Sequence, residues 1–336
     1  MTDESASRRP DDPRLLSIVV PVYNEAAAIE TFYRLLRPII DGLPLATEVW
    51  FVNDGSTDRT AEIVKDIAAA DPRVGLIDLS RNFGHQMALT AGMDHARGDL
   101  VVCMDGDGQH PPELIPEMLA AHDRGFDIVI TRRKSHGARP FKRLTSVAFY
   151  RVINYLSGTA MVPGAADFRL MSRAAINALG DARERHRFLR GLVQWIGYRS
   201  TILDFDAPPR VAGESKYSRG KMVGLAVDAI LSFSTVPLRI SIWLGFILVG
   251  LAAVELSYTA ILILSGRGSE MVPGWTSLIF SILGIGGVQL IILGVMGQYI
   301  GMIFEQVKNR PLYLLRSEVR YPRPDAAKEG DREHNE

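Results

Sequence analysis

The chain has 336 residues, 47% of them hydrophobic, which is enough for one sizeable α/β domain and a further element of roughly 100 residues. Its 38 basic and 38 acidic side chains balance, so the overall charge does not favour nucleic acid as a partner. Cys103 stands alone in the sequence and cannot form an internal disulfide, which favours a reducing compartment. Residues 1–16 are polar and lack the apolar core of a signal peptide, so we expect a disordered lead-in there.

Residues 17–131 alternate between the pattern of strands and the pattern of helices. Runs of strand length, rich in β-branched side chains, occupy residues 17–23, 48–54, 74–80, 100–105 and 127–131. Apolar residues at helical spacing occupy residues 25–40, 58–70, 84–96 and 111–122. This alternation predicts an α/β fold with a mostly parallel sheet covered by helices on both faces. Ligands of such sheets bind at the carboxyl ends of the strands.

The rest of the domain is less regularly patterned. We expect an amphipathic helix at 139–157, a short strand or turn running into a helix at 166–179, a helix at 187–199 and a strand at 200–210. The glycine-flanked polar stretch that follows predicts a mobile loop. These elements place the whole domain at residues 17–216.

Two long apolar stretches follow, at residues 238–264 and 276–304. Each exceeds the roughly 20 residues that cross a bilayer, so we predict a two-helix transmembrane hairpin over 238–304. The alternative is a buried helix of a soluble protein, but such helices are typically about half as long. Residues 217–237 place basic side chains before an apolar face, which predicts an amphipathic helix in the membrane interface.

Basic side chains flank the predicted hairpin on both of its chain ends. They are Arg219, Lys221 and Arg239 before it, and Lys308, Arg310, Arg316 and Arg320 after it. Because positive residues mark the cytoplasmic side, the sheet domain and both termini are expected in the cytoplasm, at the cell inner membrane. Residues 305–336 are expected to form a strand and a charged tail. The glycine pair Gly297 and Gly301 and this extended stretch suggest a homo-oligomer, formed by strand exchange.

Two aspartates, Asp105 and Asp107, stand at the end of the fourth predicted strand. Side chains at positions i and i+2 of an extended segment point the same way, and two carboxylates that close repel each other unless a cation lies between them. Oxygen ligands in this arrangement suit Mg²⁺ or Mn²⁺. An EF-hand is excluded, because His110 and Pro116 stand where such a loop needs glycine and glutamate.

The phosphate-binding motifs of common nucleotide folds are absent. No G-x-x-x-x-G-K-[ST] occurs, and no G-x-G-x-x-G follows the first predicted strand. Instead, Asp54 ends the second predicted strand and could accept a hydrogen bond from a pyrimidine N–H, while Glu25 could hold a ribose hydroxyl. A helix cap or an Asx turn is the alternative for Asp54. We expect His85 and His110 to be satisfied loop histidines.

Five ordered motifs carry a family resemblance. They are "VVPVYNE" (19–25), "FVNDGSTD" (51–58), "LSRNFGHQMAL" (79–89), "MDGDGQHPPE" (104–113) and "DFRLMSR" (167–173). Together they resemble the family 2 glycosyltransferases of Rossmann-like GT-A fold, and more narrowly the dolichol-phosphate mannose synthase and bactoprenol glucosyltransferase group. The resemblance covers residues 17 to about 220. It implies a nucleotide-sugar donor, a polyprenyl-phosphate acceptor and inversion at the anomeric carbon.

The resemblance also implies roles for individual residues. Those that would hold the nucleotide sugar are Pro21, Tyr23, Glu25, Asp54, Asp105, Gln109, Arg210 and Lys216. Asp105 and Asp107 would bind the metal, Asp167 and Asp107 would be catalytic, and Arg132, Arg143 and Ser146 would contact the acceptor phosphate. The side chains of 185–195 are expected to pack and pair rather than to act on substrate.

A phosphate monoester has a second pKa near 6, so such an acceptor arrives mostly ionised. The enzyme then has less need of a general base, and Asp167 is expected to orient the acceptor site or to stabilise positive character at the anomeric carbon. UDP-glucose is the first choice of donor, with mannose, galactose, an amino sugar or aminoarabinose, and GDP as the nucleotide, left open. Surface glycan modification is the expected purpose. The alternatives are a processive polysaccharide synthase, which has a Q-x-x-R-W motif and more spans, and a non-catalytic, membrane-tethered nucleotide-sugar binding subunit.

Overall fold

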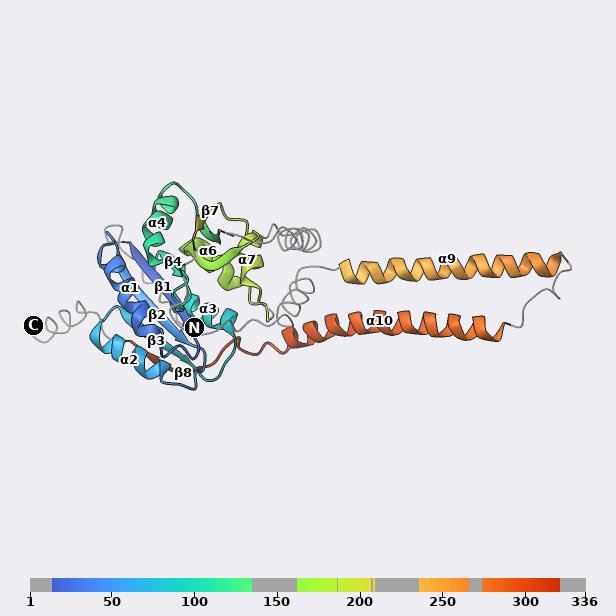
Figure 1. Cartoon of the computed structure of the whole chain (residues 1–336), viewed down its shortest axis with the longest axis horizontal. Helices are drawn as coiled ribbons and strands as arrows, with labels where there is room; N and C mark the ends of the chain where they lie inside the picture. The colour runs from blue at the N-terminus through green and yellow to red at the C-terminus, as the bar shows by residue number, and fades with distance from the viewer. Residues whose placement is uncertain are drawn as a thin grey trace, which may run out of the picture. The chain divides into compact units, whose positions relative to one another are not determined.

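The computed structural model describes residues 14–134, 162–185, 187–206, 208, 236–265 and 274–320 (Figure 1). These residues fall into two compact units. The sheet unit contains the described residues up to 208 and residues 311–320, and the helical unit contains residues 236–310.

The sheet unit holds eight strands and a set of covering helices. The strands are β1 (Leu15–Val22), β2 (Ala46–Asn53), β3 (Val74–Leu79), β4 (Leu100–Cys103), β5 (Ile128–Arg133), β6 (Ala165–Ser172), β7 (Ser200–Phe205) and β8 (Leu315–Val319). The helices are α1 (Ile29–Asp41), α2 (Thr60–Ala70), α3 (His85–His95), the 3-10 turn η1 (Pro112–Leu114), α4 (Ile115–Asp123), α6 (Arg173–Asp181) and α7 (Leu189–Trp195).

The strand order is β7-β5-β6-β4-β1-β2-β3-β8. Strands β1 to β4 are paired in parallel, as are β5 and β7, whereas β6 and β8 are antiparallel to their neighbours. The predicted mostly parallel sheet is therefore confirmed. The stretch predicted as a short strand or turn is a full strand, β6, inserted between β4 and β5.

Helices cover both faces of the sheet, as the unbroken burial of β1 requires. On one face, Leu16, Ile18 and Val20 of β1 pack in a core with residues of α1, α2 and α4. On the other face lies α3, which contacts β1 and β2, with α6 against β4 and β6. The alternation of side chains along β1 thus separates two layers of helices.

Gly92 lets α3 lie directly on the sheet. A Cβ at this position would lie 2.2 Å from Val19 Cγ1 and 3.0 Å from Val52 Cγ2. We expect Gly92→Ala to lower the free energy of unfolding by roughly 1–3 kcal/mol through overpacking, measured by chemical denaturation. Gly180→Ala in α6 is the matched control, because open space surrounds that position and alanine is the better helix former. Equal stability of the two variants would contradict this packing.

A buried carboxylate joins α1, α2 and the start of β3. Asp71 accepts a hydrogen bond from the Tyr33 hydroxyl at 2.6 Å and from Arg73 Nε and Nη2 at 2.9 and 2.7 Å. The bond to Arg73 lowers the pKa of Asp71 well below its usual range, burial opposes the shift, and the Tyr33 bond reinforces it. Because the folded pKa is depressed, this stabilisation is present above the unfolded value, about 4, and is lost as the pH falls.

We therefore expect Asp71→Asn to lower the free energy of unfolding by about 1–3 kcal/mol at pH 7. The gap from the wild type should shrink as the pH falls toward about 3, and thermal unfolding across a pH series measures it. Asp123→Asn is the control, since Asp123 and its partner Arg14 are both half exposed and such a pair contributes at most about 1 kcal/mol. A pH-independent gap for Asp71→Asn would contradict the assignment.

The helical unit consists of α9 (Val236–Leu264) and α10 (Trp275–Val307), which contact each other. Within the described part of the chain, one stretch is long and apolar enough to cross a membrane, the 24 residues Gly284–Val307 of α10. The corresponding stretch of α9, Leu238–Leu248, is shorter. One predicted span is thus matched by a candidate helix, and the second stays a prediction. Of the predicted interfacial helix, 217–235 lie outside the described residues.

The C-terminal strand predicted after the hairpin is present as β8. It pairs antiparallel with β3 of the same chain, with Leu76 opposite Val319 and Asp78 opposite Ser317. The pairing of β8 within its own sheet accounts for this extended segment without a second chain. Self-association by strand exchange stays a prediction.

Candidate active site

The ends of four strands meet at one edge of the sheet. Val22 of β1 lies opposite Asn53 of β2, and Val19 lies opposite Cys103 of β4. Because β6 runs antiparallel, with Arg169 opposite Cys103, its first residues lie beside the end of β4. The register therefore brings the following predicted residues to one edge: Pro21, Tyr23, Glu25, Asp54, Asp105, Asp107, Gln109 and Asp167.

Asp54 fixes the loop that leads into α3. Its buried carboxylate accepts hydrogen bonds from the backbone N–H groups of Phe83 and Gly84 at 2.7 and 3.0 Å. Burial raises the pKa of Asp54, and these two hydrogen bonds oppose the rise. The Asx turn considered for Asp54 is formed by Asn53 instead, whose Oδ1 accepts a hydrogen bond from the Ser56 N–H at 3.1 Å. The hydrogen bonds from Phe83 and Gly84 do not exclude contact of Asp54 with a nucleobase, because each carboxylate oxygen can accept a further hydrogen bond. That contact stays a prediction.

Gly55 allows the turn after β2 to approach this loop. It has a φ of 66°, and a Cβ there would lie 2.3 Å from the carbonyl carbon of Arg81. The backbone before His85 is therefore held from two sides, by the Asp54 carboxylate and by the close contact at Gly55.

The turn after β1 is tied to the loop after β2. Asn24 has a φ of 51°, its N–H donates to Ser56 Oγ at 2.9 Å, and its Oδ1 accepts from Thr57 N–H at 2.9 Å. Glu25 N–H donates to Thr60 Oγ1 at 3.0 Å. Tyr23 lies beside them with its side chain exposed. The two segments predicted to hold the nucleoside thus form one connected surface.

Asp105 and Asp107 do not lie on an extended segment, which corrects the sequence argument. The chain turns after Asp105, because the Asp107 carboxylate accepts from Gln109 N–H at 3.0 Å and Asp105 N–H donates to His110 Nδ1 at 2.8 Å. Within the described residues, no group of three or more His, Cys, Asp or Glu side chains is arranged to hold a metal. The two carboxylates nevertheless fit Mg²⁺ or Mn²⁺ by donor type, since such ions take much of their shell from water and phosphate.

Asp167 is the most heavily bonded carboxylate of this edge. It is 5% exposed. Its Oδ1 accepts from Arg169 Nη2 and from Arg190 Nε at 3.2 Å, and its Oδ2 accepts from Arg190 Nη2 at 2.8 Å. Burial alone would raise the pKa of Asp167, but Arg190, His85 and Arg169 outweigh it and hold the pKa well below its usual range. A carboxylate with such a low pKa is a poor general base, and the orienting role of Asp167 stays a prediction.

His85, the first residue of α3, links the two acidic groups. Its Nε2 lies 3.6 Å from Asp105 Oδ1 and 3.5 Å from Asp167 Oδ2. Burial lowers the pKa of His85, but the hydrogen bond to Asp167 and the charges of Asp105 and Asp167 raise it overall. His85 is therefore satisfied, as expected, but its partners are two of the predicted site carboxylates. The available signal was its place after a predicted strand, within a polar loop at the ligand-binding edge.

His110 meets the expectation of a satisfied loop residue. It is 6% exposed, stacks on the ring of Phe168 at 5.2 Å and meets Phe205 edge-on at 6.1 Å. Burial lowers its pKa. Its role is to close the turn that carries Asp105 and Asp107.

Arg190 of α7 also reaches this edge of the sheet, which the sequence did not reveal. Residues of this segment were expected to pack and pair, and Arg190 does pair, but its partner is Asp167 at the centre of the site. Sequence spacing cannot show this contact, because the two residues come from different elements.

The predicted acceptor residues are not brought together by the described part of the chain. Arg132 at the end of β5 forms a two-point ion pair with Asp204 of β7, at 2.6 and 2.9 Å. Arg143 and Ser146 lie outside the described residues, as do Arg210 and Lys216 of the predicted basic loop.

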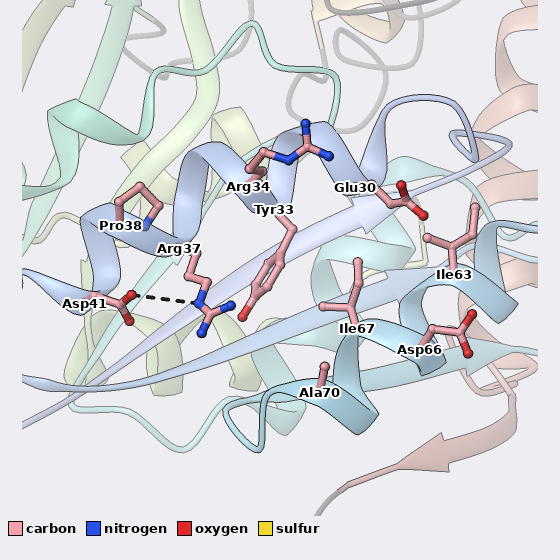
Figure 2. Close-up of a pocket in the computed structure, with 10 residues that line it drawn as sticks. All are labelled: Glu30, Tyr33, Arg34, Arg37, Pro38, Asp41, Ile63, Asp66, Ile67 and Ala70. Atoms are coloured by element: carbon pink, nitrogen blue, oxygen red, sulfur yellow. Dashed lines mark ion pairs between the residues drawn. The ribbon is translucent and has the colours of Figure 1, made fainter.

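Figure 2 shows a pocket between α1 and α2, lined among others by Tyr33, Arg37 and Asp41. None of the predicted site residues lines it. This pocket is therefore separate from the edge that carries Asp54, Asp105 and Asp167.

Comparison with known proteins places this chain in a family. The model of glycosyl transferase family 2 matches residues 17–180. An uncharacterized glycosyltransferase of Synechocystis is 42% identical over 89% of this chain and 94% of its own length. The bactoprenol glucosyl transferase of Shigella phage SfII is 39% identical over 91% of this chain and 98% of its own. The crystal structure of Mycobacterium tuberculosis glucosyl-3-phosphoglycerate synthase is 20% identical and covers 65% of this chain and 78% of its own, with a TM-score of 0.45. With relatives this similar over nearly their whole length, the chain belongs to glycosyltransferase family 2.

Proposed function

We propose that this enzyme transfers a hexose from a nucleoside-diphosphate sugar to a polyprenyl phosphate at the cytoplasmic face of the membrane. The observation that carries the proposal is the 39% identity to a phage bactoprenol glucosyl transferase, which extends over 98% of that protein and so includes its C-terminal part. Glucose from UDP-glucose is the preferred donor. The product would supply a lipid-linked sugar for modification of a surface glycan.

The proposed reaction is a single displacement that inverts the anomeric carbon. An oxygen of the acceptor phosphate forms a bond to that carbon as the bond to the leaving diphosphate oxygen breaks. The acceptor is mostly ionised near neutral pH, so no side chain has to remove a proton. Asp167 accepts hydrogen bonds from Arg169 and Arg190, which keep its carboxylate ionised. A carboxylate held in this way is a poor proton acceptor, which supports a reaction in which no side chain removes a proton.

Different residues of the site would bind the donor and the acceptor. Asp105 and Asp107 would hold Mg²⁺ or Mn²⁺, which when bound supplies Lewis-acid stabilisation of the leaving diphosphate. The nucleoside would lie against Pro21, Tyr23, Glu25 and Asp54, with Gln109 beside the sugar. Arg210 and Lys216 would close over the diphosphate, and Arg132, Arg143 and Ser146 would contact the acceptor phosphate. Arg132 would contact the phosphate either after its ion pair with Asp204 breaks or while it binds both groups.

The helical unit supports the membrane part of the proposal. Large apolar side chains are exposed along both helices, for example Trp243 at 70%, Phe246 at 67% and Ile291 at 66%. Apolar surface of this extent needs a non-aqueous environment. We propose that α9 and α10 both cross the bilayer, and that the sheet unit and both termini lie in the cytoplasm, where the basic flanks of the hairpin would place them.

The experiment is a transfer assay on membranes that contain the full chain. Radiolabelled UDP-glucose, UDP-galactose, GDP-mannose and UDP-N-acetylglucosamine are each incubated with undecaprenyl phosphate, and label is sought in the organic phase. We expect one donor, UDP-glucose first, to give lipid-linked label. Nucleotide binding without transfer from any donor would favour the non-catalytic subunit, and label in a long water-soluble polymer would favour a polysaccharide synthase.

A further inference from the structure

The segment that follows α10 in the chain joins the sheet unit at the edge that carries the candidate site. Because β8 runs antiparallel to β3, the first residues of β8 lie beside the last residues of β3. The end of β3 belongs to this edge, since Asp78 lies opposite Asn53 and Asn53 lies opposite Val22. Residues 314–316 are therefore neighbours of the loops that are predicted to hold the nucleoside.

The loop that leads from β3 to α3 is bonded to this segment through Ser80. The Ser80 N–H donates to the Leu314 carbonyl at 2.8 Å, and the Ser80 carbonyl accepts from Arg316 Nη2 at 2.9 Å. The other end of the loop donates two backbone N–H groups to the Asp54 carboxylate. The C-terminal segment and Asp54 thus hold the loop at its two ends.

A second set of contacts runs from Arg316 to the turns after β2 and β1. Arg316 Nη1 lies 3.7 Å from Oδ2 of Asp78, whose side chain is 5% exposed. The other oxygen of this carboxylate accepts from Asn53 Nδ2 at 2.7 Å, and Asn53 Oδ1 accepts from the Ser56 N–H at 3.1 Å. Ser56 Oγ in turn accepts from the N–H of Asn24 at 2.9 Å. Arg316 is thus connected, through side chains of the sheet edge, to both turns that are predicted to hold the nucleoside.

We propose that residues 314–316 are part of the donor site and that Arg316 is a positioning residue, which holds the nucleoside-binding turns in place through Ser80 and Asp78. The inference rests on the proposed function, because it takes the nucleoside of the donor to lie against the turns after β1 and β2. Loops that are held in the binding conformation before the ligand arrives lose less conformational freedom on binding, so the affinity is higher. Arg316 acts through these contacts and does not touch the reacting atoms.

The test measures nucleotide binding without turnover on the purified full chain. UDP and GDP are each titrated with Mn²⁺ present into the wild type, Arg316→Ala, Arg316→Lys and the control Arg320→Ala. Arg320 lies beyond the other end of β8, where its guanidinium lies 4.4 Å over the Trp50 ring and its Nε lies 3.2 Å from Glu318 Oε1.

We expect Arg316→Ala to weaken the nucleotide that the wild type binds by roughly 3- to 10-fold, the size of effect that the loss of one or two hydrogen bonds has. Arg316→Lys should restore part of the affinity, because it keeps a cation beside Asp78 and the Ser80 carbonyl. The Arg316 side chain is 57% exposed, so both variants should fold. Arg320→Ala removes a comparable side chain from the same strand and should bind the nucleotide as the wild type does.

Steady-state kinetics separate positioning of the turns from a role in the chemical step. Loss of a contact that only positions the nucleoside turns should raise the KM for the nucleotide sugar, and should leave kcat and the KM for polyprenyl phosphate within about twofold. A lower kcat with an unchanged KM for the nucleotide sugar would overturn the inference.

Two binding results would also overturn the inference. One is an unchanged nucleotide affinity of Arg316→Ala. The other is an equal loss of affinity in Arg320→Ala, which would indicate a general weakening of β8. A wild type that binds nucleotide but transfers no sugar would instead refute the proposed function and leave the binding test standing.

Discussion

Asp105→Asn and Asp107→Asn should each reduce sugar transfer by roughly a thousandfold or more. Stabilisation of a leaving group by a bound divalent ion is worth several kcal/mol, and each 1.36 kcal/mol corresponds to about tenfold in rate. The asparagine amide keeps the size of the side chain and, at 107, can still accept the turn bond from Gln109 N–H. The loss is therefore expected in metal binding rather than in folding.

The measurement is the initial rate of lipid-linked label, with thermal unfolding to establish that each variant is folded. Asp123→Asn is the matched control, because Asp123 is an exposed aspartate paired only weakly with Arg14, and its rate should equal that of the wild type. Full transfer by either Asp105→Asn or Asp107→Asn would show that the metal assignment is wrong.

Asp167→Asn should have the second large effect, on stability as well as on transfer. Removal of its charge leaves Arg169 buried and Arg190 partly buried with no carboxylate between them. Breaking a buried ion pair from one side costs about 3–5 kcal/mol. Transfer should also fall, by roughly 100-fold, even at temperatures where the variant is folded, because the ionised carboxylate proposed to orient the acceptor site is lost.

The pH profile separates this role from that of a general base. The pKa of Asp167 lies well below its usual range, so its stabilising contribution is present above the unfolded value, about 4, and is lost only as the pH falls below it. Wild-type kcat/KM should therefore show no ionisation of Asp167 between about pH 5 and pH 8. An acidic limb in that range that disappears in Asp167→Asn would identify Asp167 as the base and contradict the present assignment.

The sequence predicted those parts of the fold that depend on local pattern. Strands β1 to β5 are continuous apolar runs because helices cover both of their faces. The central position of β6 and the pairing of β8 with β3 depend on contacts between distant segments. Hydrophobic periodicity carries no information about such pairing, so β6 was recognised only as a short strand or turn.

The same distinction between local pattern and distant contacts applies to the residues of the candidate site. Asp54, Asp105 and Asp167 stand in motifs at strand ends, and the sheet register brings them to one edge. His85 and Arg190 become site residues only because α3 and α7 converge on Asp167. The orientation of Asp107 could not be predicted from the sequence either. The segment was expected to be extended, but it is a turn in which the Asp107 carboxylate accepts a hydrogen bond from Gln109 N–H.

The most direct test of the central claim is transfer by the purified full chain with and without chelated metal. The donor identified by the nucleotide-sugar panel is incubated with undecaprenyl phosphate, first in excess EDTA and then with Mn²⁺ or Mg²⁺ restored. The account predicts no organic-extractable label in the chelator and full recovery with the restored ion. Undiminished transfer in excess chelator would contradict it.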